Sequence, residues 1–164
     1  MKKINILTHI SHHNNFPVKA FETLYKAEEK HFWFIGRNEV INIIINRFIK
    51  QNKKIHFLEI GCGNGNVLRL LKKFGFSLTG LDIHLEGLRL ARKRTNAKLI
   101  CADIYKLHTN QKYDVVGLFD VIEHLKDDAV FLQKSGKMLK KGGKIIIRFA
   151  SLEDLNKIAK SIID

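Results

Sequence analysis

The feature that most constrains this chain is a glycine-rich turn directly after a short apolar stretch. The turn reads Gly61-Cys62-Gly63-Asn64-Gly65, and residues 55–60 before it are mainly apolar. A run of that length favours a buried strand, and residues 67–74 after the turn have helical periodicity. Glycines at alternate positions let the backbone turn tightly and approach a ligand closely. The segment therefore predicts a strand-turn-helix unit with a nucleotide-type ligand at the end of the strand.

Strand-like and helical segments alternate after this unit, which predicts an α/β fold. Further strands are expected at 76–81, 98–101, 113–119 and 144–149, and helices at 85–94, 128–139 and from Ser151 onward. The stretch 113–119 is an unbroken, largely apolar run, as strands covered on both faces are. With right-handed crossovers, we expect a Rossmann-like parallel sheet of order 3-2-1-4-5, with helices on both faces.

The chain has 164 residues, which fits one domain. Helical periodicity is also present at 18–31 and from Gly36 to Ile49, on either side of the aromatic run Phe32-Trp33-Phe34. We assign residues 1–36 to an N-terminal helical arm that caps the site, and residues 37–164 to the Rossmann-like domain. The aromatic run is expected to pack between the two helices.

Acidic residues follow the second and third predicted strands. Asp82 lies 21 residues after Gly61, the interval expected for a carboxylate that binds ribose hydroxyls. Asp103 follows the third strand, where it can accept a hydrogen bond from an adenine amino group. Either acid alone is also typical of a helix N-cap or a turn. Three consecutive strand ends with glycine, Asp and Asp are hard to explain by capping alone.

Two features separate the turn from the nicotinamide-dinucleotide pattern. Asn66 stands where that pattern has its third glycine, and Glu59 places an acid beside the turn. A pyrophosphate requires a helix N-terminus that is free of acids. A carboxylate suits a cationic or amino-bearing ligand better, and S-adenosylmethionine, with its sulfonium and α-amino groups, is one.

The ordered motifs resemble those of class I S-adenosylmethionine-dependent methyltransferases, and more narrowly the bacterial small-molecule branch related to quinone-biosynthesis methyltransferases. The motifs that carry the resemblance are Glu29–Arg37, Glu59–Gly65, Leu81-Asp82, Ala102–Ile104, Tyr113–Val116, Phe119–Leu125 and Leu139–Ile145. The resemblance implies transfer of a methyl group, by in-line displacement, to a small-molecule or lipid-like acceptor.

The resemblance also implies a donor site at the strand ends. Its cofactor-binding residues would be Arg37, Glu59, Gly61, Gly63, Asp82, Ile83, Asp103, Ile104 and Phe119. Glu59 and the two glycines would line the methionine end, whose carboxylate Arg37 would approach. Asp82 would bind the ribose, while Ile83, Asp103 and Ile104 would contact the adenine. Phe119 and Asp120 would border the sulfonium and the opening for the acceptor.

Asp120 and His124 are the expected catalytic residues. The methyl donor is already activated, so alignment supplies much of the rate, and a general base helps only if the acceptor must lose a proton. Asp120, Glu123 and His124 also share one helical face, as some metal-dependent relatives arrange their ligands. Those that act on RNA use a further histidine after the fifth strand, and no histidine follows His124 here. We assign no metal.

The formal net charge is +13, from 29 Lys and Arg against 16 Asp and Glu. Such a charge favours anionic partners, and it makes an RNA methyltransferase the alternative function. The basic residues are spread over several segments, among them Arg89, Arg92, Lys93 and Arg94, which are expected on solvated helix faces. Nucleic acid is therefore not the favoured partner. A donor-binding remnant without activity is a further alternative.

The sequence predicts a cytoplasmic protein. It has no apolar run close to the roughly 20 residues of a membrane-spanning helix. The first ten residues make a poor secretory signal. The only cysteines, Cys62 and Cys101, form no disulfide framework, which fits a reducing compartment.

Class I methyltransferases usually continue after the fifth strand into an antiparallel strand pair. This chain ends at Asp164, in or just after the helix expected from Ser151, so that pair is expected to be missing. The strand at 144–149 would then be an uncovered apolar edge. We expect either a truncation or a partner on this edge, most simply a second copy in a homodimer.

Overall fold

A computed structural model of the chain describes residues 3–8, 17–50, 54–125 and 127–148. Six parallel strands form one sheet in the order β1-β4-β3-β2-β5-β6. The strands are β1 (Ile4–Ile6), β2 (His56–Ile60), β3 (Ser77–Asp82), β4 (Lys98–Cys101), β5 (Tyr113–Phe119) and β6 (Leu139–Arg148). The α/β class is confirmed, and the five predicted strands keep their expected relative order and direction.

The sheet differs from the prediction by one additional strand, β1, at the edge beside β4. Ile4 pairs with Leu99 and Ile6 with Cys101, and the Leu7 N–H continues the ladder to the Cys101 carbonyl at 3.0 Å. A strand of only three residues carries too short an alternation to be recognised, and this one is stabilised by a neighbour almost a hundred positions away.

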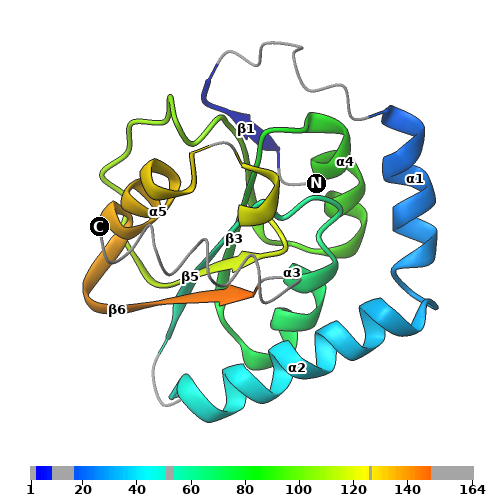
Figure 1. Ribbon diagram of the computed structural model, residues 1–164, viewed down its shortest axis with the longest axis horizontal. Helices are drawn as coiled ribbons and strands as arrows, with labels where there is room; N and C mark the ends of the chain where they lie inside the picture. Colours follow the sequence, from blue (N-terminus) through cyan, green and yellow to red (C-terminus); the bar gives the residue numbers. More distant parts are fainter. Residues whose placement is uncertain (1–2, 9–16, 51–53, 126, 149–164) are drawn as a thin grey trace.

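Helices cover both faces of the sheet (Figure 1). They are α1 (Val18–Ala27), α2 (Phe32–Phe48), α3 (Asn66–Leu71), α4 (Leu85–Arg94) and α5 (Asp128–Lys137), with short 3₁₀ turns η1 (Lys72–Phe74) and η2 (Ile122–His124). α2, α3 and α4 pack on one face, and α5 with η2 packs on the other. None of the helices in the described ranges is long and apolar enough to cross a membrane.

Neighbouring residues of the central strands point to opposite faces and so divide the core in two. Phe57 and Val115 pack with the buried isoleucines of α2 and with α3. Leu58 and Val116 pack with Phe131 of α5 on the other side. Successive side chains of a strand point to opposite faces of the sheet. Both faces are apolar here because helices cover each of them.

The N-terminal helices differ from the prediction in their bounds and in their aromatic run. The first helix ends at Ala27, and α2 begins at Phe32 and continues through Gly36, so the arm boundary that we set at residue 36 falls inside a helix. The aromatic run is not a buried plug, since Phe32 is 79% exposed and Trp33 40% exposed.

The last described strand begins earlier than predicted. α5 ends at Lys137, and β6 starts at Leu139, which pairs with Tyr113. The next pair is Val115 with Lys144, so the ladder takes up extra residues there, and Gly142 has a φ of 75°. The pair of glycines is therefore an irregularity within β6 rather than a turn before it. The helix expected from Ser151 lies outside the described residues.

One arginine of α4 fastens α1 to the rest of the fold. The Arg94 guanidinium donates to the Glu28 carboxylate and to the Tyr25 carbonyl, and it lies 3.7 Å from the Tyr25 ring centroid. Its side chain is only 2% exposed. The expectation that this basic cluster is solvated is thus wrong for Arg94, because its partners come from a helix almost 70 positions earlier.

We predict that Arg94→Met lowers the free energy of unfolding by about 3 kcal/mol, because it leaves the buried Glu28 carboxylate without a counter-charge. Arg89→Met in the same helix is the matched control, since the Arg89 side chain is 65% exposed and its loss should change stability by less than about 0.5 kcal/mol. Urea denaturation measures both. Equal effects of the two substitutions would contradict the conclusion that Arg94 fastens α1 to the rest of the fold.

Candidate functional site

The glycine-rich turn links β2 to α3 and has the backbone that its glycines allow. Gly61, Gly63 and Gly65 have φ values of 77°, 46° and 72°, a region that side chains disfavour. A Cβ on Gly61 would lie 2.7 Å from Val121, and one on Gly65 would lie 2.8 Å from Ala91. A Cβ on Gly63 would meet nothing within 4 Å. The turn is therefore closely packed at both ends and leaves space at Gly63.

The carboxylate of Asp82 connects this turn to the end of β3. The Gly63 N–H donates to Oδ2 at 2.7 Å, and the His84 N–H donates to Oδ1 at 2.7 Å. Burial raises the pKa of Asp82, and the backbone donors oppose that rise. Each carboxylate oxygen can accept a second hydrogen bond. Asp82 thus holds two loops together and still has acceptor capacity for hydroxyl groups.

Glu59, in β2 two residues before the turn, is a second buried acid. Its side chain is buried, and its Oε2 has no hydrogen-bond partner among the described residues. Burial raises the pKa of its carboxyl well above the ordinary value of 4.5, while the Arg37 guanidinium opposes the rise. A buried acceptor without a donor costs free energy. This oxygen therefore indicates a place for a cationic or N–H donor of a ligand.

The N-terminal helices are tied to the turn through Asn66, the first residue of α3. Its Oδ1 accepts from Arg37 at 3.0 Å and from Asn38 at 2.7 Å, both in α2. Its Nδ2 donates to the Glu28 carbonyl after α1, at 3.3 Å. Arg37 is thereby placed at the turn, close enough to Glu59 to affect the ionisation of that residue.

Asp120 lies directly after β5 and joins three elements. It accepts from Arg37 of α2 at 3.1 Å and from Arg148 at the end of β6. Its φ is 53°, and it is the one non-glycine residue in the described ranges with positive φ, a region that Asp tolerates better than most residues. Arg37 and Asp120 are two separately predicted site residues, and they are in direct contact although 83 positions separate them in the sequence.

Asp103 follows β4, beside the end of β3. Its Oδ1 accepts from the Tyr105 N–H at 2.9 Å, and its own N–H donates to the Thr8 hydroxyl after β1 at 2.8 Å. The carboxylate is about 80% buried. Because the Ala102 N–H donates to the Asp82 carbonyl at 3.0 Å, the two acids follow adjacent strand ends, as the sequence predicted.

The remaining predicted residues lie partly in the core and partly at the surface. Ile104 packs in the core on the α5 side, and Phe119 packs in the core on the α2 side. Ile83 is half-buried after β3, and His124 is exposed at the end of η2. In the described chain, no three His, Cys, Asp or Glu residues gather as a metal site. Asp120 in particular is directed at two arginines.

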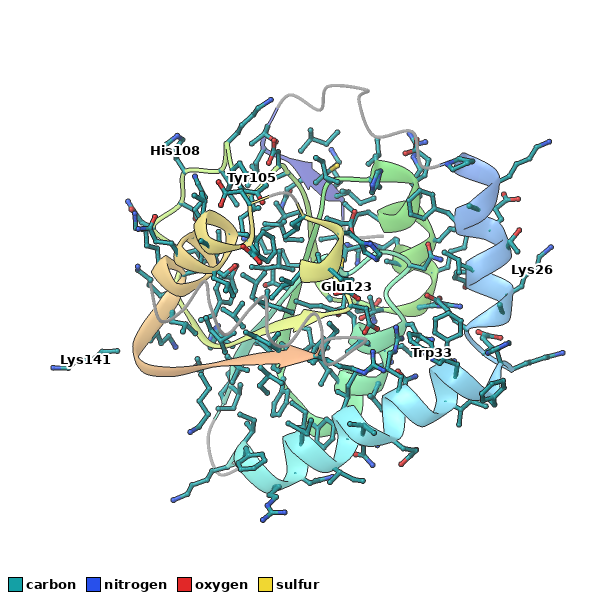
Figure 2. The ribbon with its side chains drawn as sticks, viewed as in Figure 1. Lys26, Trp33, Tyr105, His108, Glu123 and Lys141 are labelled. Atoms are coloured by element: carbon teal, nitrogen blue, oxygen red, sulfur yellow. The ribbon has the colours of Figure 1, made fainter. Side chains whose placement is uncertain are left out.

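The sequence did not point to three residues of this region. In the sequence Asn66 is distinguished only as a departure from a glycine pattern, although it makes three hydrogen bonds. The sequence pattern places Arg148 in an edge strand and Trp33 in a packed aromatic run, and it gives neither a role in the site. Trp33 lies within 5.5 Å of both Arg37 and Arg148, measured from its ring centroid. Figure 2 labels Trp33 on α2 and Glu123 in η2.

The sequence of the chain is similar to those of known proteins. Residues 32–160 match the family of methyltransferase domains, and the chain belongs to that family. It is 28% identical to the ubiquinone biosynthesis O-methyltransferase of Pelagibacter ubique over 153 residues, which are 90% of this chain and 61% of that protein. It is 32% identical to the enzyme of that name from Hydrogenovibrio crunogenus over 118 residues, 66% of this chain and 49% of that protein.

Solved structures agree on the fold. The PH0226 protein of Pyrococcus horikoshii OT3 superposes with a TM-score of 0.66 at 24% identity, covering 88% of this chain and 66% of that one. The plantazolicin methyltransferase BpumL, solved with SAH, has a TM-score of 0.65 at 23% identity, covering 87% and 57%. The resemblance inferred from the motifs is confirmed. The chain spans about half to three fifths of the curated relatives that it matches.

We predict that Glu59→Gln stabilises the protein at pH 8 and that the gain shrinks toward pH 4. The pKa of Glu59 is higher in the folded state than its ordinary value of 4.5. Between these two pKa values the folded state binds more protons, so stability falls as pH rises through that window. A Gln side chain has no charge to desolvate, so the variant does not lose folding stability as the pH rises through this window.

Urea denaturation at both pH values measures the effect. Glu22→Gln, on the exposed side of α1, is the control and should change stability by less than about 0.5 kcal/mol at either pH. A Glu59→Gln variant less stable than the parent chain at pH 8 would contradict the assignment.

Proposed function

We propose that this chain is the donor-binding part of an S-adenosylmethionine-dependent methyltransferase with a small-molecule or lipid-like acceptor. The observation that carries the proposal is the buried Glu59 carboxyl, whose Oε2 has no described partner, beside a turn with free space at Gly63. An α-ammonium group would supply the missing donor. The names of the curated relatives support an O-methyltransferase of this kind.

Each end of the donor has matching groups in the site. Glu59 binds the α-ammonium group, and Gly61 and Gly63 allow the backbone to approach the methionine end. The Arg37 guanidinium binds the carboxylate. Asp82 accepts from the ribose hydroxyls with the lone pairs that Gly63 and His84 leave open. Asp103 accepts from the adenine amino group with the oxygen that Tyr105 leaves open.

The three apolar residues contribute in different ways. Ile83 borders the adenine from its half-buried position after β3. Ile104 and Phe119 have their side chains in the core, so in this assignment they pack beneath the donor and do not contact it through their side chains. Only the Phe119 backbone borders the sulfonium. Because the Phe119 side chain is packed in the core at the end of β5, it fixes the position of the backbone at the next residue, Asp120.

When bound, S-adenosylmethionine supplies an already activated methyl group, so the protein needs to align the acceptor oxygen rather than provide a nucleophile. Asp120 is engaged by two guanidinium groups, which suits it to hold Arg37 and Arg148 in position. His124 is exposed at the end of η2 and is the residue that we assign to accept a proton from the acceptor.

The cysteines support a cytoplasmic location. Cys62 and Cys101 are both buried free thiols, which fits the cytoplasm as the working compartment.

The edge of β6 supports the pairing of two copies of the chain. Within the described chain, β6 pairs only with β5, and Ile145, Ile146 and Ile147 along it are half-buried. A second copy that pairs along this edge would complete its hydrogen bonds.

We predict that S-adenosylhomocysteine binds and raises the melting temperature, whereas NAD does neither. The acid beside the turn favours an ammonium group over a pyrophosphate. Thermal shift and titration calorimetry measure both ligands. An equal response to the two ligands would remove the donor assignment.

Asp82→Asn should weaken S-adenosylhomocysteine binding by about tenfold or more, because the ribose hydroxyls lose a charged acceptor. Glu22→Gln again serves as the charge-matched control and should bind as the parent chain does. Unchanged affinity in Asp82→Asn would place the ribose elsewhere.

If two copies pair along β6, multi-angle light scattering should give twice the mass of one chain. The mass should fall toward that of one chain on dilution, because the interface is a single strand edge. A constant monomer mass at every concentration would exclude the pairing.

A further inference from the structure

Exposed lysines from distant parts of the sequence gather at the edge of the sheet where the parallel strands begin. The proposed donor residues lie at the opposite edge, where the strands end. Figure 2 shows Lys141 projecting from the molecule on the opposite side from Trp33. Seven exposed lysines belong to the segments that lead into or begin β2, β4, β5 and β6. Together they form the lysine edge, which consists of Lys54, Lys98, Lys112, Lys137, Lys140, Lys141 and Lys144.

Hydrogen bonds connect the segments that carry these lysines. Lys98, at the start of β4, donates to the Gln111 side chain before β5 at 3.1 Å. The Lys112 amino group, directly before β5, donates to the carbonyl of Lys137 at the end of α5. The lysine edge is therefore one continuous surface that runs across the sheet from β4 to β6.

The lysine edge carries a large excess of positive charge. Asp114 is the one acidic side chain at this edge in the described part of the chain. Its carboxylate accepts from Lys140 at 2.9 Å and from the His56 N–H at 2.9 Å. Glu59 and Asp82 lie at the other ends of their strands. Seven lysines against one aspartate leave six positive charges, almost half of the formal net charge of +13.

Helix ends explain only a small part of this cluster. A cation in the last turn of a helix is stabilised by the partial negative charge there, and Lys137 is such a residue in α5. The other six lysines lie in strands or in the segments before them. Like charges that the fold brings to one edge repel one another. The cluster therefore indicates a partner that supplies negative charge.

The chemistry of the lysine edge fits a phosphate backbone better than a lipid surface or a second copy. Surface binding to a bilayer usually adds inserted apolar side chains to the charges, and the exposed large apolar residues of the described chain all lie in other segments. A second copy would bring the same positive charge against this one. The edge covers four inter-strand spacings, about 19 Å, and a nucleic-acid duplex carries one charge per about 1.7 Å of axis.

We propose that the lysine edge binds the phosphate backbone of a nucleic-acid duplex without reading its sequence. All seven cations are lysines, which act as point charges on phosphates, whereas base recognition most often uses the planar fork of arginine. The duplex binds on the side of the sheet opposite the donor site. It is therefore a docking partner rather than the methyl acceptor, and the inference goes beyond the proposed function.

The test measures binding of the whole chain to a DNA duplex of about 24 base pairs by fluorescence anisotropy, with NaCl varied from about 50 to 200 mM. Six neutralised phosphates should give a slope of about −5 for log K against log salt. A triple variant, Lys54→Gln with Lys141→Gln and Lys144→Gln, should bind at least tenfold more weakly, and its slope should be shallower by about 3. An RNA duplex of the same sequence should bind within about threefold of the DNA, because the contacts are to phosphates.

Two matched variants separate the lysine edge from overall charge and from unfolding. Lys19→Gln with Lys26→Gln and Lys30→Gln removes the same charge from exposed positions in and just after α1, and it should weaken binding by less than about threefold. Arginine at the three substituted positions of the lysine edge should retain binding, since the charge remains. All of these variants should bind S-adenosylhomocysteine as the parent chain does. Failure of the parent chain to bind that ligand would reject the proposed function and leave the duplex measurement intact.

Several results would overturn the proposal. They are no saturable duplex binding at about 50 mM NaCl, equal weakening by the two triple glutamine variants, or a strong preference between the RNA and DNA duplexes. Vesicles of phosphatidylcholine and phosphatidylglycerol, at the same phosphate concentration as the duplex, form the last comparison. They should bind more weakly than the duplex. Tighter binding to the vesicles that is lost in the lysine-edge variant would assign this surface to anionic lipid instead.

Discussion

The carboxylate of Asp82 is the constraint on which the site depends. It is buried at the end of β3, and it receives the N–H groups of Gly63 and His84 from two different loops. A carboxylate buried in this way must be hydrogen-bonded. The requirement fixes the glycine turn after β2 relative to the start of α4. Asn66, which begins α3 directly after this turn, accepts a hydrogen bond from Arg37, and Arg37 in turn donates to Asp120.

Much of this arrangement could be predicted from local patterns. Positive φ at Gly61, Gly63 and Gly65 follows from glycines at alternate positions after a strand, and Asp82 ends its strand while Asp103 lies two residues after its own. Parallel topology brings such strand ends to one edge of the sheet. Each of these inferences needed only a few neighbouring residues and a rule that holds for any chain.

The rest depends on contacts between distant segments. An unbroken apolar run such as 113–119 does not reveal which residues face α2 and which face α5, so the side chain of Phe119 could not be placed from it. Arg94 and Arg89 are alike in sequence, yet one is buried by α1 and the other is solvated. Arg148 contacts Trp33 and Asp120, and neither lies near it in the sequence.

Asn66 shows how a departure from a ligand-binding pattern can serve a structural need. In dinucleotide-binding turns, a glycine at this position lets the helix begin close to the strand and the pyrophosphate. Here the amide side chain joins both N-terminal helices to the turn, and a glycine would remove all of these bonds at once. The helix start that could have received a phosphate instead anchors the N-terminal helices. The residue that departs from the dinucleotide pattern is thus the one that anchors much of the first fifty residues.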